Sequence, residues 1–410
     1  MKGRISIWFF DIMHYHATRL NSFKRLAEEH GYKVFIYSLM EGAPDRPAAS
    51  YHNINKAGGQ VSCYSLGEKS PELPNIGFQN SFSTNIEVLG SSRVPLNSLQ
   101  TVAKLWSVLN RDNPEVVVIP GYRSWPCFAA LGWCKLKSRL PILMSESHKR
   151  DFPRVWWKES LKRVIVKRFD AALVGGTPQF HYARELGLPP QRIFTGYDVV
   201  DNRFWQEKAD TIRKQGINRR QAGLPERFFL TACRFISKKN ISGLLQAYSH
   251  YRALAGAKAW DLVICGSGEL EPKIRTEINT SGLERFVHLP GYKKAEEMTV
   301  FYGSASAFIL PSSHAEQWGL VVNEAMASGL PVLVSEICGC VNDLVQNGVN
   351  GFTFDPFDVE GLALLMLKMS SGQVDLEAMG AASRRIIAAW TPETFARSLL
   401  QAVEAARMKR

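Results

Sequence analysis

Short hydrophobic runs alternate with amphipathic segments along almost the whole chain, and this alternation constrains the fold more than any other feature. The runs are rich in Val, Ile, Leu and Phe, as in Glu115–Ile119 and Ala307–Leu310, and they predict strands buried on both faces. Segments such as Leu99–Arg111 and Ile241–Leu254 carry apolar residues at helical spacing. Alternation of this kind predicts an α/β fold with doubly wound parallel sheets, whose functional loops follow the carboxyl ends of the strands.

The other expected elements follow the same two patterns. The remaining expected strands are Ile5–Phe10, Lys33–Tyr37, Ile142–Ser145, Ala171–Val174, Phe229–Cys233, Asp261–Cys265, Phe286–Leu289 and Pro331–Val334, and the remaining expected helices are Asn21–His30, Val321–Ser328 and Val359–Met369. Residues 40–95 lack periodicity and are rich in Ser, Asn, Gly and Pro, so we expect irregular loops around one or two short strands there.

The length predicts two domains. A chain of 410 residues is too long for one compact core. We place the linker near residues 198–206, which gives a first domain over 1–200 and a second over 201–388. In the last segment, 389–410, Thr391 is the expected N-cap of a helix and Pro392 its first residue. We expect this helix to pack back on the first domain.

Charge and cysteine content narrow the class of protein. The net charge of +12 favours an anionic partner, such as a phosphorylated substrate or a lipid surface. No run reaches the roughly eighteen apolar residues of a membrane span. The seven cysteines are scattered, without a His/Cys cluster, so we expect reduced thiols in a cytoplasmic protein and no metal site.

The stretch "HAEQWGLVVNEAMASGLPV", residues 314–332, contains two carboxylates eight positions apart. Glu316 falls in a loop after a buried strand, and Glu324 falls about one turn into the following helix. The free N–H groups near Gly319 and Leu320 favour negative charge, as at phosphate sites on helix N-termini. Two carboxylates beside an anion site suit a sugar–diphosphate–sugar ligand, although a solvated loop acid and a favourable early-helix acid would give the same pattern.

Basic residues follow another predicted strand. Arg234 lies at its end and Lys239 five residues further on, where both would neutralise a departing diphosphate; Lys238 has an equal claim to be an ordinary surface charge. Gly266, in "LVICGSGEL", marks a tight strand-to-helix turn that alone indicates little more than a turn.

These motifs together resemble glycosyltransferase family 4. The resemblance covers residues 193–400 and rests on spaced elements that agree in order. They are Arg234 and Lys239, the "CGSGEL" turn, "VHLPGY" (Val287–Tyr292), the Glu316-x7-Glu324 pair with its "LPSSHAEQWGLVVNEAMASGLPV" context, and "NGVNGFTFDP" (Asn347–Pro356).

The resemblance implies a GT-B fold, in which two Rossmann-like domains face a central cleft. It implies that the first domain, 1–200, binds the acceptor and that the second, 201–388, binds the nucleotide sugar. It implies a retaining transfer of a sugar from a nucleotide-sugar donor, with no cofactor and no essential metal. By position, Arg234 and Lys239 would hold the diphosphate, Glu324 the ribose hydroxyls, and Glu316 the transferred sugar beside the Gly319 and Leu320 amides. Gly266, and the backbone near Pro290 and Tyr292, would complete the donor site.

The first half departs from the family pattern. The glycine-rich loop expected after the first strand is replaced by "FFDIMHYHATRL", and the histidine expected after the fourth strand is absent from "VVVIPGYRSW". His148, His14 and His16 are the candidates for an acceptor or sugar contact from neighbouring strand ends, although a loop histidine is more often a polar surface group.

A basic run, "KRDFPRVWWKESLKRVIVKR", occupies residues 149–168 and carries eight Lys and Arg against two acidic residues. Trp157, Lys158, Lys162 and Arg163 would form a membrane-surface element on an amphipathic helix. A core-facing helix with a solvated basic face is an equal alternative. A membrane role fits a saccharide or lipid-linked acceptor and a peripheral position on the inner face of the plasma membrane.

Other functions remain open at this point. A nicotinamide-dependent oxidoreductase requires G-x-G-x-x-G after an early strand, and "FFDIMHYHATR" lacks it. A nucleotide-sugar epimerase of the same fold is not excluded. A non-catalytic anion- or membrane-binding protein leaves the paired glutamates unexplained. Nucleic-acid binding is disfavoured because the sequence shows no recognised binding module.

Overall fold

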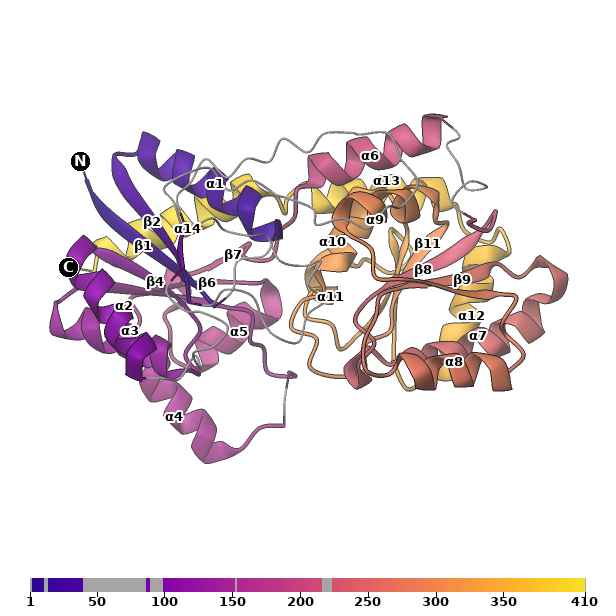
Figure 1. The fold of residues 1–410 in the computed structure, drawn as a ribbon, viewed down its shortest axis with the longest axis horizontal. Coiled ribbons are helices and arrows are strands. Elements are labelled where there is room, and N and C mark those ends of the chain that lie inside the picture. The colour runs from indigo at the N-terminus through magenta and orange to yellow at the C-terminus, as the bar shows by residue number, and fades with distance from the viewer. Residues whose placement is uncertain are drawn as a thin grey trace.

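The computed structural model describes residues 2–10, 14–39, 86–88, 99–151, 153–215 and 223–409. Within them the chain forms a seven-stranded and a six-stranded parallel sheet, each covered by helices on both faces (Figure 1). The strand orders are β3-β2-β1-β4-β5-β6-β7 and β10-β9-β8-β11-β12-β13. The second is the 3-2-1-4-5-6 order of the dinucleotide-binding fold, and the first extends that order by one edge strand. The predicted doubly wound α/β fold is confirmed.

The bounds of the elements are as follows. The first sheet contains β1 (Gly3–Phe9), β2 (Tyr32–Ser38), β3 (Ile86–Val88), β4 (Val116–Pro120), β5 (Leu140–Ser145), β6 (Ala171–Val174) and β7 (Ile193–Thr195). The second contains β8 (Phe228–Ala232), β9 (Asp261–Cys265), β10 (Val287–Gly291), β11 (Ala307–Leu310), β12 (Val332–Ser335) and β13 (Gly351–Phe354). The described helices are α1 (His14–Glu29), α2 (Leu99–Asp112), α3 (Trp125–Leu136), α4 (Trp156–Val166), α5 (Thr177–Glu185), α6 (Asn202–Gln215), α7 (Ile241–Ala255), α8 (Glu271–Thr280), α9 (Ala295–Ser304), α10 (Leu320–Ala327), α11 (Val341–Leu344), α12 (Val359–Ser370), α13 (Leu376–Ile387) and α14 (Pro392–Arg407).

Every strand expected from a hydrophobic run is present, with ends shifted by at most two residues. The sequence analysis did not specify β13 or the helices α3, α5, α6, α8, α9, α11 and α13. Of the loops and strands expected over residues 40–95, only β3 lies inside the described residues. The domain junction also differs from the expected linker, because α6 starts at Asn202. There the Asp201 carboxylate caps the helix by accepting from the Phe204 N–H at 3.0 Å.

Each strand of the first sheet contributes to two cores because successive side chains point to opposite faces. In β4, Val116 and Val118 join a core with α1 and α14, whereas Val117 and Ile119 join a core with α2 and α3. The residues on both faces of β4 are fully buried, which explains why its sequence is a continuous hydrophobic run. The second sheet is built on the same plan.

The helix α14 packs on the first sheet although it follows the second domain in the chain (Figure 1). The Thr391 hydroxyl accepts from the Thr394 N–H at 3.3 Å, and Pro392 is the first helical residue. Phe395 and Leu399 are fully buried in the core that includes β1 and α1.

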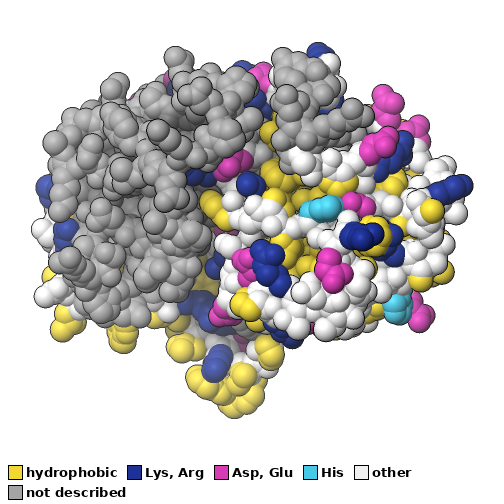
Figure 2. Space-filling view, turned by 45° about the vertical axis from the view of Figure 1, so that its right-hand side comes forward, with side chains coloured by type: hydrophobic (Ala, Val, Ile, Leu, Met, Phe, Trp, Pro, Cys, Tyr) yellow, Lys and Arg dark blue, Asp and Glu magenta, His cyan; other side chains and the backbone are white. Residues whose placement is uncertain are grey.

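The helix α4 presents its apolar stripe to solvent. Trp157, Leu161 and Val164 are each more than half exposed, and Trp156 is 81% exposed. Lys158 and Arg163 are exposed beside them. We call these six side chains the α4 tip. It projects from the lower edge of the molecule, where Figure 2 shows a cluster of hydrophobic side chains with cations.

The cation Lys162 does not belong to this surface, contrary to the prediction that grouped it with Lys158 and Arg163. Its ammonium faces the protein, 2.6 Å from the Glu159 carboxylate and 3.1 Å from the Tyr182 hydroxyl. The alternative in which the apolar side of α4 faces the core is also wrong. Lys162 faces the protein with its hydrogen-bond partners, whereas the apolar side chains named above are mostly exposed to solvent. None of the described helices is long and apolar enough to cross a membrane.

The position of Phe395 predicts that α14 is part of the first domain's folding unit. We expect Phe395→Ala to lower the free energy of unfolding by about 3–5 kcal/mol, because it removes a fully buried ring from the core. The exposed Arg397 on the same helix provides the control, and Arg397→Ala should change stability by less than about 0.5 kcal/mol. Urea denaturation of both variants measures the difference; equal stability would contradict the packing of α14.

Candidate active site

The loop between β11 and α10 places Glu316 at the carboxyl edge of the second sheet. Its carboxylate is buried and forms an ion pair with Lys239, while the Ser312 hydroxyl donates to it at 2.8 Å. Lys238 lies 3.9 Å away. Burial alone would raise the pKa of Glu316, but the charges of Lys239 and Lys238 hold it below its usual value. The carboxylate is therefore ionised and serves as the counterion of two lysines.

The turn after β8 supplies these lysines. Residues Ser237–Lys239 form one 3₁₀ turn, which brings both ammonium groups to the same loop. The Lys238 ammonium also donates to the Ala315 carbonyl at 3.1 Å, and Ala315 has a left-handed backbone with φ 51°. A non-glycine residue in this region is strained, so the loop that carries Glu316 is held in a constrained conformation.

The guanidinium of Arg234 completes a group of three cations. Arg234 is exposed. Burial lowers the pKa of Lys238, the charges of Lys239 and Arg234 lower it further, and Glu316 opposes the shift. The sequence analysis put Arg234 and Lys239 at a common cleft, and the structure brings both to the same strand end. The sequence analysis did not predict that Lys238 also approaches Glu316. Its position next to Lys239 in the same turn could have indicated this.

The helix α10 begins beside these cations. Its N-cap is Gly319, with φ 107°, and a Cβ there would lie 2.8 Å from Leu310. Glu324 is the fifth helical residue and receives a 2.8 Å hydrogen bond from the buried Tyr302 hydroxyl. Burial raises the pKa of Glu324 to about 7, and the Tyr302 hydrogen bond partly opposes this shift. Glu324 is thus an acid that a suitable ligand would ionise, one turn away from the free amides around Leu320.

Three residues assigned to the donor site occupy the neighbouring strand ends. Gly266 packs against the end of β8, where a Cβ would lie 1.8 Å from the Cys233 carbonyl oxygen. This close approach requires glycine whether or not a ligand binds. Pro290 is half-buried within β10, and Tyr292 is exposed just after it.

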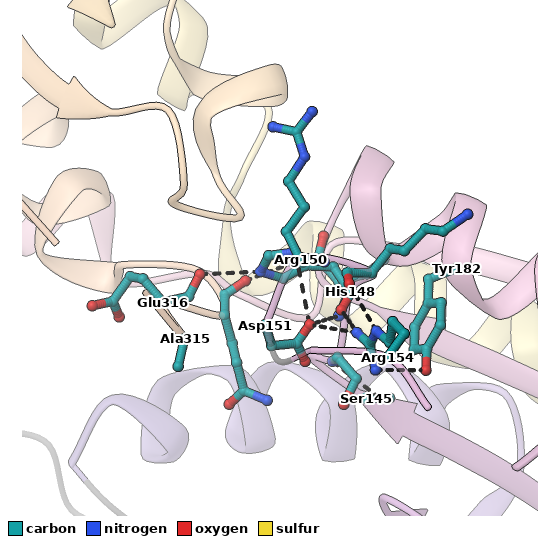
Figure 3. A network of polar contacts seen from close by, with 12 residues as sticks. Ser145, His148, Arg150, Asp151, Arg154, Tyr182, Ala315 and Glu316 are labelled. Carbon is teal, nitrogen blue, oxygen red and sulfur yellow. Dashed lines mark hydrogen bonds and ion pairs between the residues drawn. The ribbon is translucent and has the colours of Figure 1, made fainter. Parts of the chain in front are cut away.

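The side chain of His148 links the two domains (Figure 3). Its Nδ1 accepts from the Arg150 N–H at 3.3 Å, so Nε2 carries the proton and donates to the Glu316 carbonyl at 3.2 Å. The ring is buried, and Arg154 and Asp151 hold the loop that carries it. In this structure His148 therefore positions the Glu316 loop instead of facing an open cavity.

The other two candidate histidines lie on α1. His16 is buried with its ring 4.7 Å from that of Phe9. His14 is the first residue of the helix, and its side chain lies outside the described residues. Neither is brought to the Glu316 carboxylate by a described contact.

Further hydrogen bonds hold the domains together around this site. Asp343 accepts from the Thr177 N–H at 2.9 Å and from its hydroxyl at 2.6 Å. The Asn323 side chain donates to the Asp198 carbonyl at 3.0 Å. The carboxyl edges of the two sheets consequently face one another across a shared cleft.

Comparison with known proteins finds a family match in the second domain. Residues 214–386 match the family model described as glycosyl transferases group 1. The GT-B fold is also that of solved glycosyltransferases such as Anabaena HepE in complex with UDP and glucose, which aligns over 98% of this chain and 100% of its own with a TM-score of 0.71 at 14% identity.

Curated relatives match part of this chain. The amylovoran biosynthesis glycosyltransferase AmsK of Erwinia amylovora is 28% identical over 253 residues, which are 60% of this chain and 56% of that protein. Mannosylfructose-phosphate synthase of Agrobacterium fabrum is 30% identical over 54% of this chain and 48% of its own length. The chain thus spans about half the length of each of these two relatives.

The raised pKa of Glu324 predicts a pH dependence of stability. Because the folded state keeps this proton up to about pH 7 while the unfolded chain loses it near 4.5, the free energy of unfolding falls as pH rises through that window. We expect the free energy of unfolding of Glu324→Gln not to fall in this way. Between pH 4 and pH 8 the stability of this variant relative to the wild type should therefore rise by up to about 3 kcal/mol. Denaturant titration at each pH measures it; parallel curves for the two proteins would show that Glu324 has an ordinary pKa.

Proposed function

We propose that the chain is a retaining hexosyltransferase that moves a sugar from a nucleoside diphosphate sugar to a lipid-linked or surface-polysaccharide acceptor. The observation that carries the proposal is the pairing of Lys238 and Lys239 with the Glu316 carboxylate, with Arg234 close enough to act on Lys238, in a domain that matches group 1 glycosyl transferases. The name of AmsK, which refers to amylovoran biosynthesis, supports a polysaccharide acceptor, and the binding of UDP and glucose by HepE supports the donor class.

The charge of the cluster suits a diphosphate. Three cations and one carboxylate leave a surplus of two positive charges, which matches the negative charge that a diphosphate brings. The helix dipole at the start of α10 adds to this attraction. Because burial weakens screening by solvent, the cluster would stabilise the extra charge that the leaving group acquires.

In the proposed reaction, the bond between the anomeric carbon and the diphosphate oxygen breaks, and a bond to the acceptor hydroxyl oxygen forms on the same face of the ring. The hydroxyl proton passes to the departing diphosphate. Arg234 and Lys239 hold that diphosphate, Glu324 binds the ribose hydroxyls, and Glu316 orients the transferred sugar. No cofactor enters this scheme, and the expectation that no metal is essential stays a prediction.

The exposure of Arg234 gives the sharpest test of the donor site. We expect Arg234→Ala to leave stability unchanged but to weaken binding of a nucleoside diphosphate about tenfold or more, because a charge-assisted hydrogen bond is lost. A thermal-shift series with UDP, GDP and ADP finds the base that stabilises the wild type, and calorimetry then gives the affinities. Lys239→Ala is less informative, since it leaves Glu316 buried without its closest counterion.

The matched control is Arg285→Ala. Arg285 is exposed near the start of β10, at the opposite edge of the second sheet, so its loss should not change nucleotide affinity. Equal affinity of the Arg234 variant and the wild type would remove the diphosphate assignment. With the matching nucleotide sugar, transfer to an added acceptor without epimerised donor distinguishes a transferase from an epimerase.

The α4 tip supports the lipid-linked acceptor. Four exposed apolar side chains beside Lys158 and Arg163 combine the two features that hold a helix at an anionic bilayer surface. The loop that leads into α4 starts at the carboxyl end of β5, on the cleft side of the first domain. We infer that the protein sits peripherally on the inner face of the plasma membrane and takes its acceptor from the bilayer.

Vesicle binding tests this inference. We expect the wild type to co-sediment with vesicles of phosphatidylcholine and phosphatidylglycerol at low salt, and Lys158→Glu combined with Arg163→Glu to abolish it, because each cation near the surface contributes about 1 kcal/mol. Trp156→Ser should weaken binding without loss of stability. Two controls should bind as the wild type does: Lys162→Gln, whose ammonium faces inward, and Leu364→Ser, which changes an exposed residue of the second domain. Binding that is unaffected by the changes in α4 would contradict the inference.

A further inference from the structure

A cavity of about 230 Å³ lies at the carboxyl edge of the first sheet, across the cleft from the donor site. The ends of β1, β4, β5 and β7 supply most of its wall through Phe10, Tyr122, Glu146 and Tyr197, and Gln317 of the second domain closes it. Its volume is below the roughly 300–1,000 Å³ of pockets for drug-sized ligands, so it has room for about one sugar ring.

A group of ionisable side chains forms one end of this cavity. Glu146 follows β5 and is half-buried with access to the cavity, whereas Asp198 lies behind it and is almost fully buried. Both carboxylate oxygens of Asp198 are buried, and the neighbouring Glu146 contributes to its pKa. Arg19 of α1 contributes the charge that opposes both acids, while its guanidinium donates to the Tyr197 carbonyl at 2.6 Å.

Two carboxylates cannot both be ionised here at low cost, because one guanidinium balances only one of them. Burial, and then the charge of Glu146, raise the pKa of Asp198 well above its usual value. Burial also raises the pKa of Glu146; the charge of Arg19, the Asp198 carboxyl group and the charge of Lys238 oppose this shift without cancelling it, while Glu316 reinforces it. Asp198 is therefore the neutral member of the pair, and Glu146 is the member whose carboxyl group faces the cavity.

The wall of the cavity combines two kinds of surface. Phe10, Tyr122 and Tyr197 offer aromatic carbon, which suits the C–H face of a sugar ring. Glu146 and Gln317 offer acceptor oxygens for hydroxyl groups. This mixture of apolar wall and few polar groups is typical of a site that orients a small polyhydroxyl ligand.

We propose that this cavity is the acceptor subsite and that the Glu146 carboxylate binds hydroxyl groups of the acceptor sugar. Asp198 and Arg19 act as positioning residues, since they lie beside Glu146 and hold its carboxyl group at the cavity without touching the ligand. The inference rests on the proposed sugar transfer and adds to it a recognition residue on the opposite domain. Glu146 is close enough to Glu316 and Lys238 for their charges to affect its pKa, which places the two subsites next to each other.

The test separates acceptor recognition from donor chemistry. Hexyl glycosides of glucose, galactose and mannose are titrated into the protein with UDP present, and the glycoside that binds the wild type is then used with the donor found by thermal shift. We expect Glu146→Gln to raise the acceptor Kd and KM about tenfold or more while donor hydrolysis and donor KM stay within about twofold. Glu146→Asp, which keeps the carboxyl group, should recover part of the acceptor affinity. If the Gln variant does not fold, the change in acceptor Kd of the Asp variant relative to the wild type tests the proposal instead.

The control is Glu185→Gln, because Glu185 is a surface acid that pairs with Lys149 outside the cavity. An unchanged acceptor Kd in Glu146→Gln, an equal loss of donor hydrolysis and transfer, or failure of every glycoside to bind the wild type would each overturn the proposal. A wild type that no nucleotide stabilises would instead reject the proposed function, whereas glycoside binding that Glu146→Gln weakens would still support the cavity assignment.

Discussion

The burial of one carboxylate, Glu316, determines how the cleft is arranged. A buried carboxylate requires a counterion, and Lys239 and Lys238 provide it from the turn after β8. The same residue presents its backbone carbonyl to His148 of the first domain, so one loop connects the donor cations with the opposite sheet. In the absence of ligand the glutamate keeps the lysines in place. A diphosphate would therefore meet cations that are already oriented, and little reorganisation would be needed to bind it.

The sequence was informative where function and secondary structure depend on local pattern. Fully buried strands such as β4 and β11 leave a continuous hydrophobic run because both faces are covered, and such runs located nearly every strand. Glu316, Glu324, Arg234 and Lys239 were predicted as site residues for a related reason, because each follows the end of such a strand in the loop or the first turns of the next helix. Local capping chemistry likewise located α14 through Thr391 and Pro392.

The remaining features depend on contacts between distant parts of the chain. The three members of the acid–arginine group, Arg19, Glu146 and Asp198, come from α1 and from the ends of β5 and β7, and no spacing in the sequence connects them. The orientation of α4 could not be predicted from the sequence either. The apolar side and the basic side of this helix both follow helical spacing, so either could face the core. The choice between them is made by Glu159 and Tyr182, which accept the Lys162 ammonium and turn the tryptophans outward.

The return of α14 to the first sheet has a consequence for synthesis. The core that contains β1, α1 and β4 also contains Phe395, Leu399 and Val403, which are translated only after the whole second domain. When the first sheet of a nascent chain has left the ribosome, the helix α14, which covers one face of that sheet, has not yet been synthesised. The second domain can complete its own core earlier, so the order of domain maturation should run opposite to the order of translation, and the exposed face of the early sheet is where a chaperone would bind.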